Sequence, residues 1–215
     1  MILVNFKLTK STFGDGAIKL AKICKEVMEE TGVKIIPVVS ALDAYRIQKE
    51  VGIKVYLQSI DEFDEGSHSG YISPVAAKEL GIEGSLINHS EHRLKPGTIL
   101  GILKKLPDNF ETVLCLQTLG QTEGWAKNIK SKYIAYEPSQ FIGNREKSVA
   151  TEKPEVIKKM VDKYPKIPVL VGAGVHSKED VVISLGLGAK GILVATDVVK
   201  ADDPKKELTK LARGF

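Results

Sequence analysis

The chain has few cysteines, one tryptophan and no long apolar run, and these shortages exclude several classes of protein. Its two cysteines, Cys24 and Cys115, cannot form the disulfide framework of a small secreted domain. No segment approaches the roughly 20 consecutive apolar residues of a membrane span. Residues 1–7 lack a signal-peptide pattern and read as a strand. We therefore expect a cytoplasmic protein with two buried thiols and no membrane partner.

An excess of charge of one sign is also lacking. The chain has 31 Lys and Arg against 27 Asp and Glu, a formal net charge of +4, and these charges are scattered along predicted helices. A nucleic-acid-binding protein normally gathers basic residues in a patch or stripe. The balance therefore argues against a nucleic-acid partner and weakly favours small anionic ligands.

With 215 residues, of which 43% are hydrophobic, the chain is long enough for one well-packed domain and short for two. No linker or low-complexity tract interrupts it, so we expect a single domain over residues 1–215. Near-continuous apolar runs predict strands buried on both faces, at residues 2–6, 34–39, 54–57, 85–87, 112–116, 133–136, 169–171 and 192–195. Amphipathic stretches between them predict helices, most clearly at 15–30, 41–51, 154–164, 178–187 and 204–212.

Eight strands with crossover connections leave two α/β architectures, a doubly wound open sheet and a closed (βα)8 TIM barrel of parallel strands surrounded by helices. The strand count favours the barrel. So does the lack of a G-x-G-x-x-G sequence after the first strand, which an open dinucleotide-binding sheet would carry there.

A carboxylate at the end of one predicted strand is the most informative feature. The run Ala135-Tyr136-Glu137-Pro138 ends an apolar strand abruptly, because proline cannot extend the sheet. In a parallel barrel the carboxyl ends of the strands are where chemistry is built. The following residues, 139–151, show no clear period and suggest a mobile lid.

Other predicted strand ends add a cation, a histidine and two small-residue loops. Asn5 and Lys7 are two residues apart and are expected to point the same way. His89 lies in the run 88–93, and residues 172–174 and 195–197 follow the last two strands. Taken singly, a solvated Lys7, a structural His89, an ion-paired Glu137 and a plain glycine turn explain these features equally well.

Together, and in this strand order, the motifs resemble triosephosphate isomerase, particularly its shorter archaeal form. They are Asn-x-Lys at the first strand, Asn-His-Ser-Glu after the fourth, and Glu-Pro followed by Ile-Gly after the sixth. The resemblance covers nearly the whole chain. It implies interconversion of dihydroxyacetone phosphate and D-glyceraldehyde 3-phosphate through an enediolate, with no metal and no organic cofactor.

The resemblance also implies a role for each matching residue. Glu137 matches the base, His89 the neutral electrophile that binds the carbonyl oxygen, and Lys7 the fixed positive charge, with Asn5 beside it. Glu91 matches a carboxylate that orders the lysine, and Ser90 a partner of the base. Backbone N–H groups would hold the phosphate at Gly143, Gly174, Ala195 and Thr196.

Three positions depart from the family pattern. Asn144 and Arg145 stand in the lid where small residues are usual, and Asp197 adds a negative charge near the expected phosphate site. We expect Asp197 to point away or to pair with Lys200. A barrel that binds sugar phosphates without turning them over is therefore one competing function, and another phosphate-binding barrel isomerase of similar layout is a second.

The resemblance implies an oligomer as well. The loop 66–70 matches a long loop that docks beside a neighbouring subunit's Asn-x-Lys and histidine segments in the family, which predicts a homodimer or homotetramer. A free surface loop rich in glycine and serine is the alternative.

Overall fold

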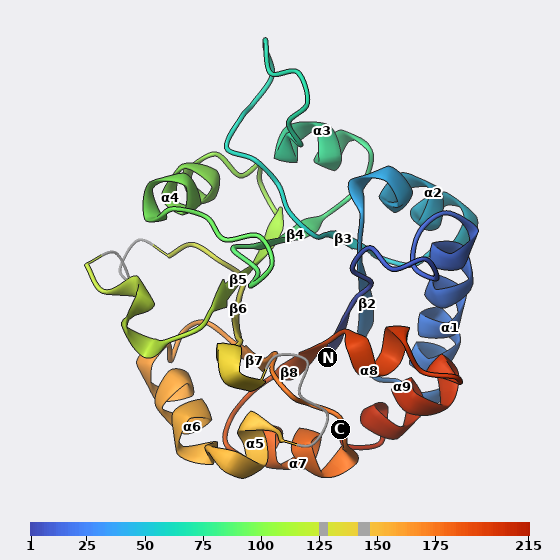
Figure 1. Ribbon diagram of the computed structural model, residues 1–215. Helices are drawn as coiled ribbons and strands as arrows, with labels where there is room; N and C mark the ends of the chain where they lie inside the picture. The colour runs from blue at the N-terminus through green and yellow to red at the C-terminus, as the bar shows by residue number, and fades with distance from the viewer. Residues whose placement is uncertain (125–128, 142–146) are drawn as a thin grey trace.

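Eight parallel strands close into a barrel in which the first strand pairs with the eighth. The computed structural model describes residues 1–124, 129–141 and 147–215, and Figure 1 looks along the barrel axis. The strands are β1 (Ile2–Asn5), β2 (Ile35–Val39), β3 (Tyr56–Leu57), β4 (Gly84–Ile87), β5 (Glu111–Leu116), β6 (Tyr133–Tyr136), β7 (Val169–Val171) and β8 (Gly191–Val194). Closure confirms the predicted barrel and excludes the doubly wound open sheet.

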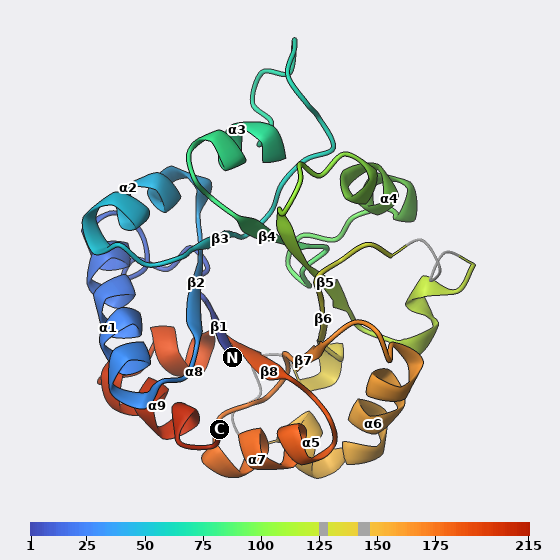
Figure 2. The same cartoon turned by 180° about the vertical axis from the view of Figure 1, so that it is seen from behind.

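Helices form the outer ring in both views along the axis (Figures 1 and 2). They are α1 (Asp15–Thr31), α2 (Ala41–Val51), α3 (Pro74–Glu79), α4 (Pro96–Lys104), α5 (Val149–Glu152), α6 (Pro154–Lys163), α7 (Lys178–Gly186), α8 (Thr196–Val199) and α9 (Pro204–Ala212). Short 3₁₀ turns add η1 (Leu119–Thr122) and η3 (Ser139–Phe141). Of the described residues between β5 and β6, only η1 is helical, which helps to explain how a barrel fits into so short a chain.

Alternation along each strand divides the apolar side chains into two cores. In β1, Leu3 points into the barrel, whereas Ile2 and Val4 pack against the helices. The inner core contains one or two residues from each of the eight strands: Leu3, Ile36, Val38, Tyr56, Leu86, Val113, Cys115, Ala135, Leu170 and Leu193. Because successive side chains of a strand face opposite sides, the residue two places after an inward one also faces inward. Residues that directly follow a strand, two places after an inward-facing residue, are therefore expected to face the barrel axis at its carboxyl end.

The predicted elements differ from the observed ones mainly at their ends. β1 stops at Asn5, one residue earlier than expected, and β3 is two residues long instead of four. The five predicted helices are all present within a residue or two, but α3, α4, α5 and α8 were not singled out. Within the described ranges, no helix is both long and apolar enough to cross a membrane.

One connection projects from the ring. The segment between β3 and α3 extends outward beyond the helices in both views (Figures 1 and 2). Its base is closed by the backbone N–H of Asp61 donating to Ile72 O at 2.9 Å and by Ile72 N–H donating to the Asp61 carboxylate at 2.7 Å. Phe63 packs in a tilted arrangement against two other aromatic rings, with its ring centroid 4.5 Å from that of His68 and 4.3 Å from that of Tyr71.

Candidate active site

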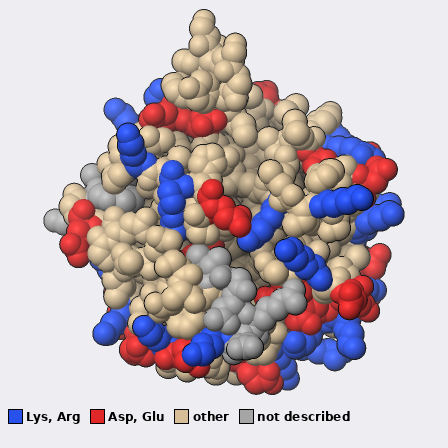
Figure 3. Space-filling view, viewed as in Figure 1, with Lys and Arg blue, Asp and Glu red and all other residues tan. Residues whose placement is uncertain are grey.

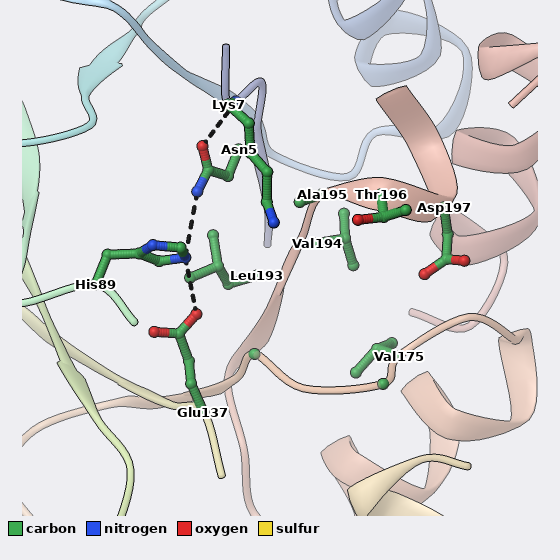
Figure 4. A pocket seen from close by; sticks show the side chains of 12 residues that line it. Asn5, Lys7, His89, Glu137, Val175, Leu193, Val194, Ala195, Thr196 and Asp197 are labelled. Atoms are coloured by element: carbon green, nitrogen blue, oxygen red, sulfur yellow. Dashed lines mark hydrogen bonds and ion pairs between the residues drawn. The ribbon is translucent and has the colours of Figure 1, made fainter. Parts of the chain in front are cut away.

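Glu137 lies in a buried position at the carboxyl end of the barrel, with its side chain 3% exposed. It follows the inward-facing Ala135 by two residues, so strand alternation aims it at the axis. Its Oε1 is 3.3 Å from Nε2 of His89, as Figure 4 shows. Its Oε2 is buried and has no hydrogen-bond partner in the described part of the chain. A buried carboxylate with an unused oxygen can accept a proton from a bound molecule.

The surroundings of Glu137 are close and partly charged. A Cβ added to Gly172 would lie 2.8 Å from Cγ of Glu137, so only glycine leaves room for the carboxylate there. Burial, and after it the negative charge of Glu137, raises the pKa of the Cys115 thiol well above its ordinary value. Burial lowers the pKa of Arg93, and the nearby Glu137 charge opposes that change.

His89 is held with its Nε2 toward the base. Its Nδ1 accepts the backbone N–H of Glu91 at 3.3 Å, and its carbonyl oxygen accepts the N–H of His92 at 2.9 Å. Because Nδ1 is an acceptor, the ring proton of the neutral imidazole is assigned to Nε2. The segment after His89 is a hydrogen-bonded turn, and helix α4 begins only at Pro96. A backbone amide of this turn therefore fixes the tautomer.

Lys7 reaches the same pocket by a turn of the backbone. Its φ of 53° lies in the left-handed region, beyond the end of β1. We expected Asn5 and Lys7 to share one strand face, and this reasoning was wrong because the strand ends between them. Asn5 Oδ1 accepts the backbone N–H of Lys7 at 3.0 Å, and Gln58 donates to the Lys7 carbonyl oxygen at 2.9 Å. These two bonds hold a conformation that lysine rarely adopts.

The charge of Lys7 is paired with Glu91, as the family resemblance implied. Its Nζ lies 2.7 Å from the carboxylate of Glu91. The other Glu91 oxygen is 3.8 Å from Nδ1 of His89, beyond hydrogen-bond distance. Nδ2 of Asn5 is 3.4 Å from Nε2 of His89 (Figure 4). In the space-filling view of this face, acidic and basic side chains border a central hollow (Figure 3). Ser90, which was expected to be a hydrogen-bond partner of Glu137, directly follows His89 in the sequence. Its buried Oγ has no hydrogen-bond partner among the described residues.

The other side of the pocket is built from backbone and small side chains. Gly174 has a φ of 67°, and a Cβ there would lie 2.5 Å from the Lys147 carbonyl oxygen. Ala195 precedes the short helix α8, which Thr196 begins. These residues share the pocket wall with the histidine and the base; its members are Asn5, Lys7, His89, Glu137, Gly172, Gly174, Val175, Leu193, Val194, Ala195, Thr196 and Asp197.

Two expectations concern residues near the predicted phosphate site, Asp197 and the segment 143–145. Asp197, which we expected to turn away or pair with Lys200, is part of the pocket wall and is drawn there in Figure 4. Gly143, Asn144 and Arg145 lie outside the described residues. Sequence reasoning missed two residues that support the site. Gln58 donates a hydrogen bond to the backbone carbonyl oxygen of Lys7. Arg93 donates one to the carbonyl oxygen of Asn88, and its positive charge lies near Glu137. Within residues 1–124, 129–141 and 147–215, no group of three or more His, Cys, Asp or Glu side chains is arranged to hold a metal ion.

Fold and site together define a (βα)8-barrel enzyme of acid–base chemistry, with a carboxylate facing an imidazole and a backbone-lined pocket beside them. Comparison with known proteins specifies the family. The family model for triosephosphate isomerase matches residues 1–213. The triosephosphate isomerase of Methanothermus fervidus is 39% identical over 216 residues, covering 98% of this chain and 96% of the relative.

Further relatives carry the same name. The protein of Methanobacterium bryantii is 38% identical over 216 residues, covering 98% of this chain and 95% of its own. That of Metallosphaera sedula is 35% identical over 218 residues, covering 100% of this chain and 95% of its own. The chain belongs to the triosephosphate isomerase family.

Proposed function

We propose that this chain interconverts dihydroxyacetone phosphate and D-glyceraldehyde 3-phosphate, with Glu137 as the base and His89 as the electrophile. The observation that carries the proposal is the approach of Nε2 of His89 to Oε1 of Glu137, 3.3 Å, within a buried site at the barrel's carboxyl end. Two groups so close can act on adjacent atoms of one small substrate.

The reaction requires removal of a proton from a carbon next to a carbonyl group. Glu137 takes that proton and returns it to the neighbouring carbon, while the hydroxyl proton of the first carbon passes to the oxygen of the second, so that the ketose becomes the aldose. The Nε2–H of a neutral His89 donates a hydrogen bond to the substrate oxygen on which negative charge develops. The backbone N–H of Glu91 supports this role because it occupies Nδ1 at 3.3 Å.

Lys7 provides the fixed positive charge. Its ammonium group lies at the pocket and is held by Glu91 at 2.7 Å, while Asn5 fixes the backbone of the lysine. A charge placed before the reaction begins stabilises the enediolate without reorganisation. Ser90, whose Oγ is buried and unpaired among the described residues, serves as a partner for Glu137 when the carboxylate swings away from His89.

The phosphate group binds on the glycine side of the pocket. Backbone N–H groups at Gly174, Ala195 and Thr196 hold it. The place of Gly174, Ala195 and Thr196 in one pocket wall with His89 and Glu137 supports this proposal.

A coupled dehydrogenase assay run in D2O tests the proposal. We expect isomerisation of glyceraldehyde 3-phosphate and deuterium in the product, because the carboxylate that carries the proton exchanges it with solvent. Competitive inhibition by inorganic phosphate should accompany it. Phosphate binding without isomerisation would instead support the competing sugar-phosphate binder and contradict the proposed function.

We also propose that the chain works as a homo-oligomer in the cytoplasm, built from dimers. Tyr71 of the projecting loop, residues 61–73, lines one opening with Tyr45 and Leu80, and all three side chains are 45–54% exposed, so a second copy would cover them. An opening of about 300 Å³ beside Lys7 and His89 is available to receive a neighbour's loop. The free, buried Cys24 and Cys115 agree with a reducing compartment.

Light scattering after size exclusion tests the assembly. We expect a mass of two or four chains for the parent and of one chain for Tyr71→Asp. Val182→Asp, at a residue of α7 that is 50% exposed, is the matched control and should stay oligomeric. A parent mass of one chain would contradict the proposal.

A further inference from the structure

Asn88, the residue before His89, has an unusual backbone and a fully engaged side chain. It is one of three non-glycine residues with positive φ in the described part of the chain, with a φ of 62° and a residue exposure of 3%. Its Oδ1 accepts the backbone N–H of Leu94 at 2.9 Å, and its Nδ2 donates to the Cys115 carbonyl oxygen at 2.8 Å. Its own carbonyl oxygen accepts Nη1 of Arg93 at 2.8 Å.

These bonds tie the histidine segment to a strand that bears no predicted catalytic side chain. β5 lies between β4, which leads to His89, and β6, which leads to Glu137. The Cys115 carbonyl oxygen accepts the Asn88 side chain at 2.8 Å, and the next carbonyl oxygen, that of Leu116, accepts the backbone N–H of Glu137 at 2.7 Å. The electrophile and the base are thus attached to consecutive peptide groups of β5.

The turn alone does not account for asparagine at this position. Glycine adopts a φ of 62° at no steric cost, so a residue needed only for the turn would best be glycine. Asparagine tolerates this region and adds a side chain whose two ends both find partners. Alternation along β4 explains its direction, because Asn88 follows the inward-facing Leu86 by two residues.

We propose that Asn88 is a positioning residue that sets the spacing between His89 and Glu137 by anchoring the histidine segment to β5. The inference rests on the proposed function of those two residues. Asn88 does not touch the substrate; it holds the imidazole at 3.3 Å from the carboxylate. Loss of the anchor lets the ring drift from the base while the phosphate side of the pocket keeps its shape.

Replacement of Asn88 by glycine tests the role of the side-chain hydrogen bonds separately from the role of the left-handed turn. Asn88→Gly keeps the left-handed turn and removes both side-chain bonds, so we expect kcat to fall about 10-fold or more, as misplacement of a reacting group does. KM and the inhibition constant of inorganic phosphate should stay within about twofold of the parent. Asn109→Gly is the matched control, because Asn109 has the same φ of 62° on an exposed loop and should keep the parental kcat.

A second variant covers the case in which the glycine variant fails to fold. Asn88→Asp preserves the shape and the bond from Leu94 but places an oxygen against the Cys115 carbonyl group, and kcat should fall again with phosphate inhibition unchanged. A folded Asn88 variant as fast as the parent would overturn the inference, as would equal losses in kcat and phosphate affinity. An inactive parent would overturn the proposed function itself, a distinct result.

Discussion

Gly172 leaves no room for a side chain beside the proposed base. A Cβ at this position would lie 2.8 Å from Cγ of Glu137 and 3.5 Å from its Cδ and Oε1, whereas ordinary carbon contacts begin near 3.4 Å. In Gly172→Ala the side chain of Glu137 must therefore shift by about 0.6 Å or more, at a cost of about 1–3 kcal/mol of stability, the usual range for overpacking. A displaced base should lower kcat by about 10- to 100-fold.

The assay is steady-state isomerisation at a temperature well below unfolding, with thermal unfolding measured in parallel. Gly97→Ala is the control, because a Cβ there meets nothing within 4 Å, and it should leave kcat unchanged. If Gly172→Ala lowers kcat only by displacing Glu137, then adding it to the Glu137→Gln variant should lower kcat almost no further, since effects within one catalytic unit are not additive. A Gly172→Ala enzyme with parental kcat would refute the steric reasoning.

Three further predictions concern other parts of the site and the buried thiols. Lys7→Met should lower kcat about 10²- to 10³-fold, the loss typical of removing one group that stabilises an oxyanion; a loss under threefold would rule out an electrostatic role. Gly174→Ala should raise KM for the triose phosphate more than it lowers kcat if the phosphate binds, as proposed, to the pocket wall that contains Gly174; an unchanged KM would remove it from that site. Burial raises the pKa of Cys24 and of Cys115, so the unfolded chain loses these protons first and the free energy of unfolding should fall as pH rises above about 8.5. Cys24→Ala should reduce that slope by about 1.4 kcal/mol per pH unit in urea unfolding, and an unchanged slope would contradict the assignment.

The strand order and the position of a carboxylate at a strand end could be predicted because each depends on local pattern. Apolar runs gave eight strands, and Glu137 before Pro138 marked a strand end that faces the open rim. The pairing of Lys7 with Glu91 was also predicted and is observed at 2.7 Å. The strand features depend on residue type and local spacing, which the sequence displays directly, whereas the Lys7–Glu91 pair joins residues 84 apart and was implied by the family resemblance.

Contacts between distant segments could not be predicted in this way. The left-handed turn at Lys7 depends on Gln58, 51 residues away, and the anchoring of Asn88 depends on a carbonyl group 27 residues away. Such bonds involve backbone atoms, which every residue carries, so no residue type marks them. Helices α3 and α8, with six and four residues, are too short to show a helical period.

The most direct measurement of the account's central claim is the activity of Glu137→Gln. The variant keeps the size of the side chain and removes the base, so kcat should fall by about 10²- to 10⁴-fold, the contribution of a positioned general base. Its thermal unfolding and its competitive binding of inorganic phosphate should match the parent. A folded Glu137→Gln protein that isomerises triose phosphate at the parental rate would contradict the account.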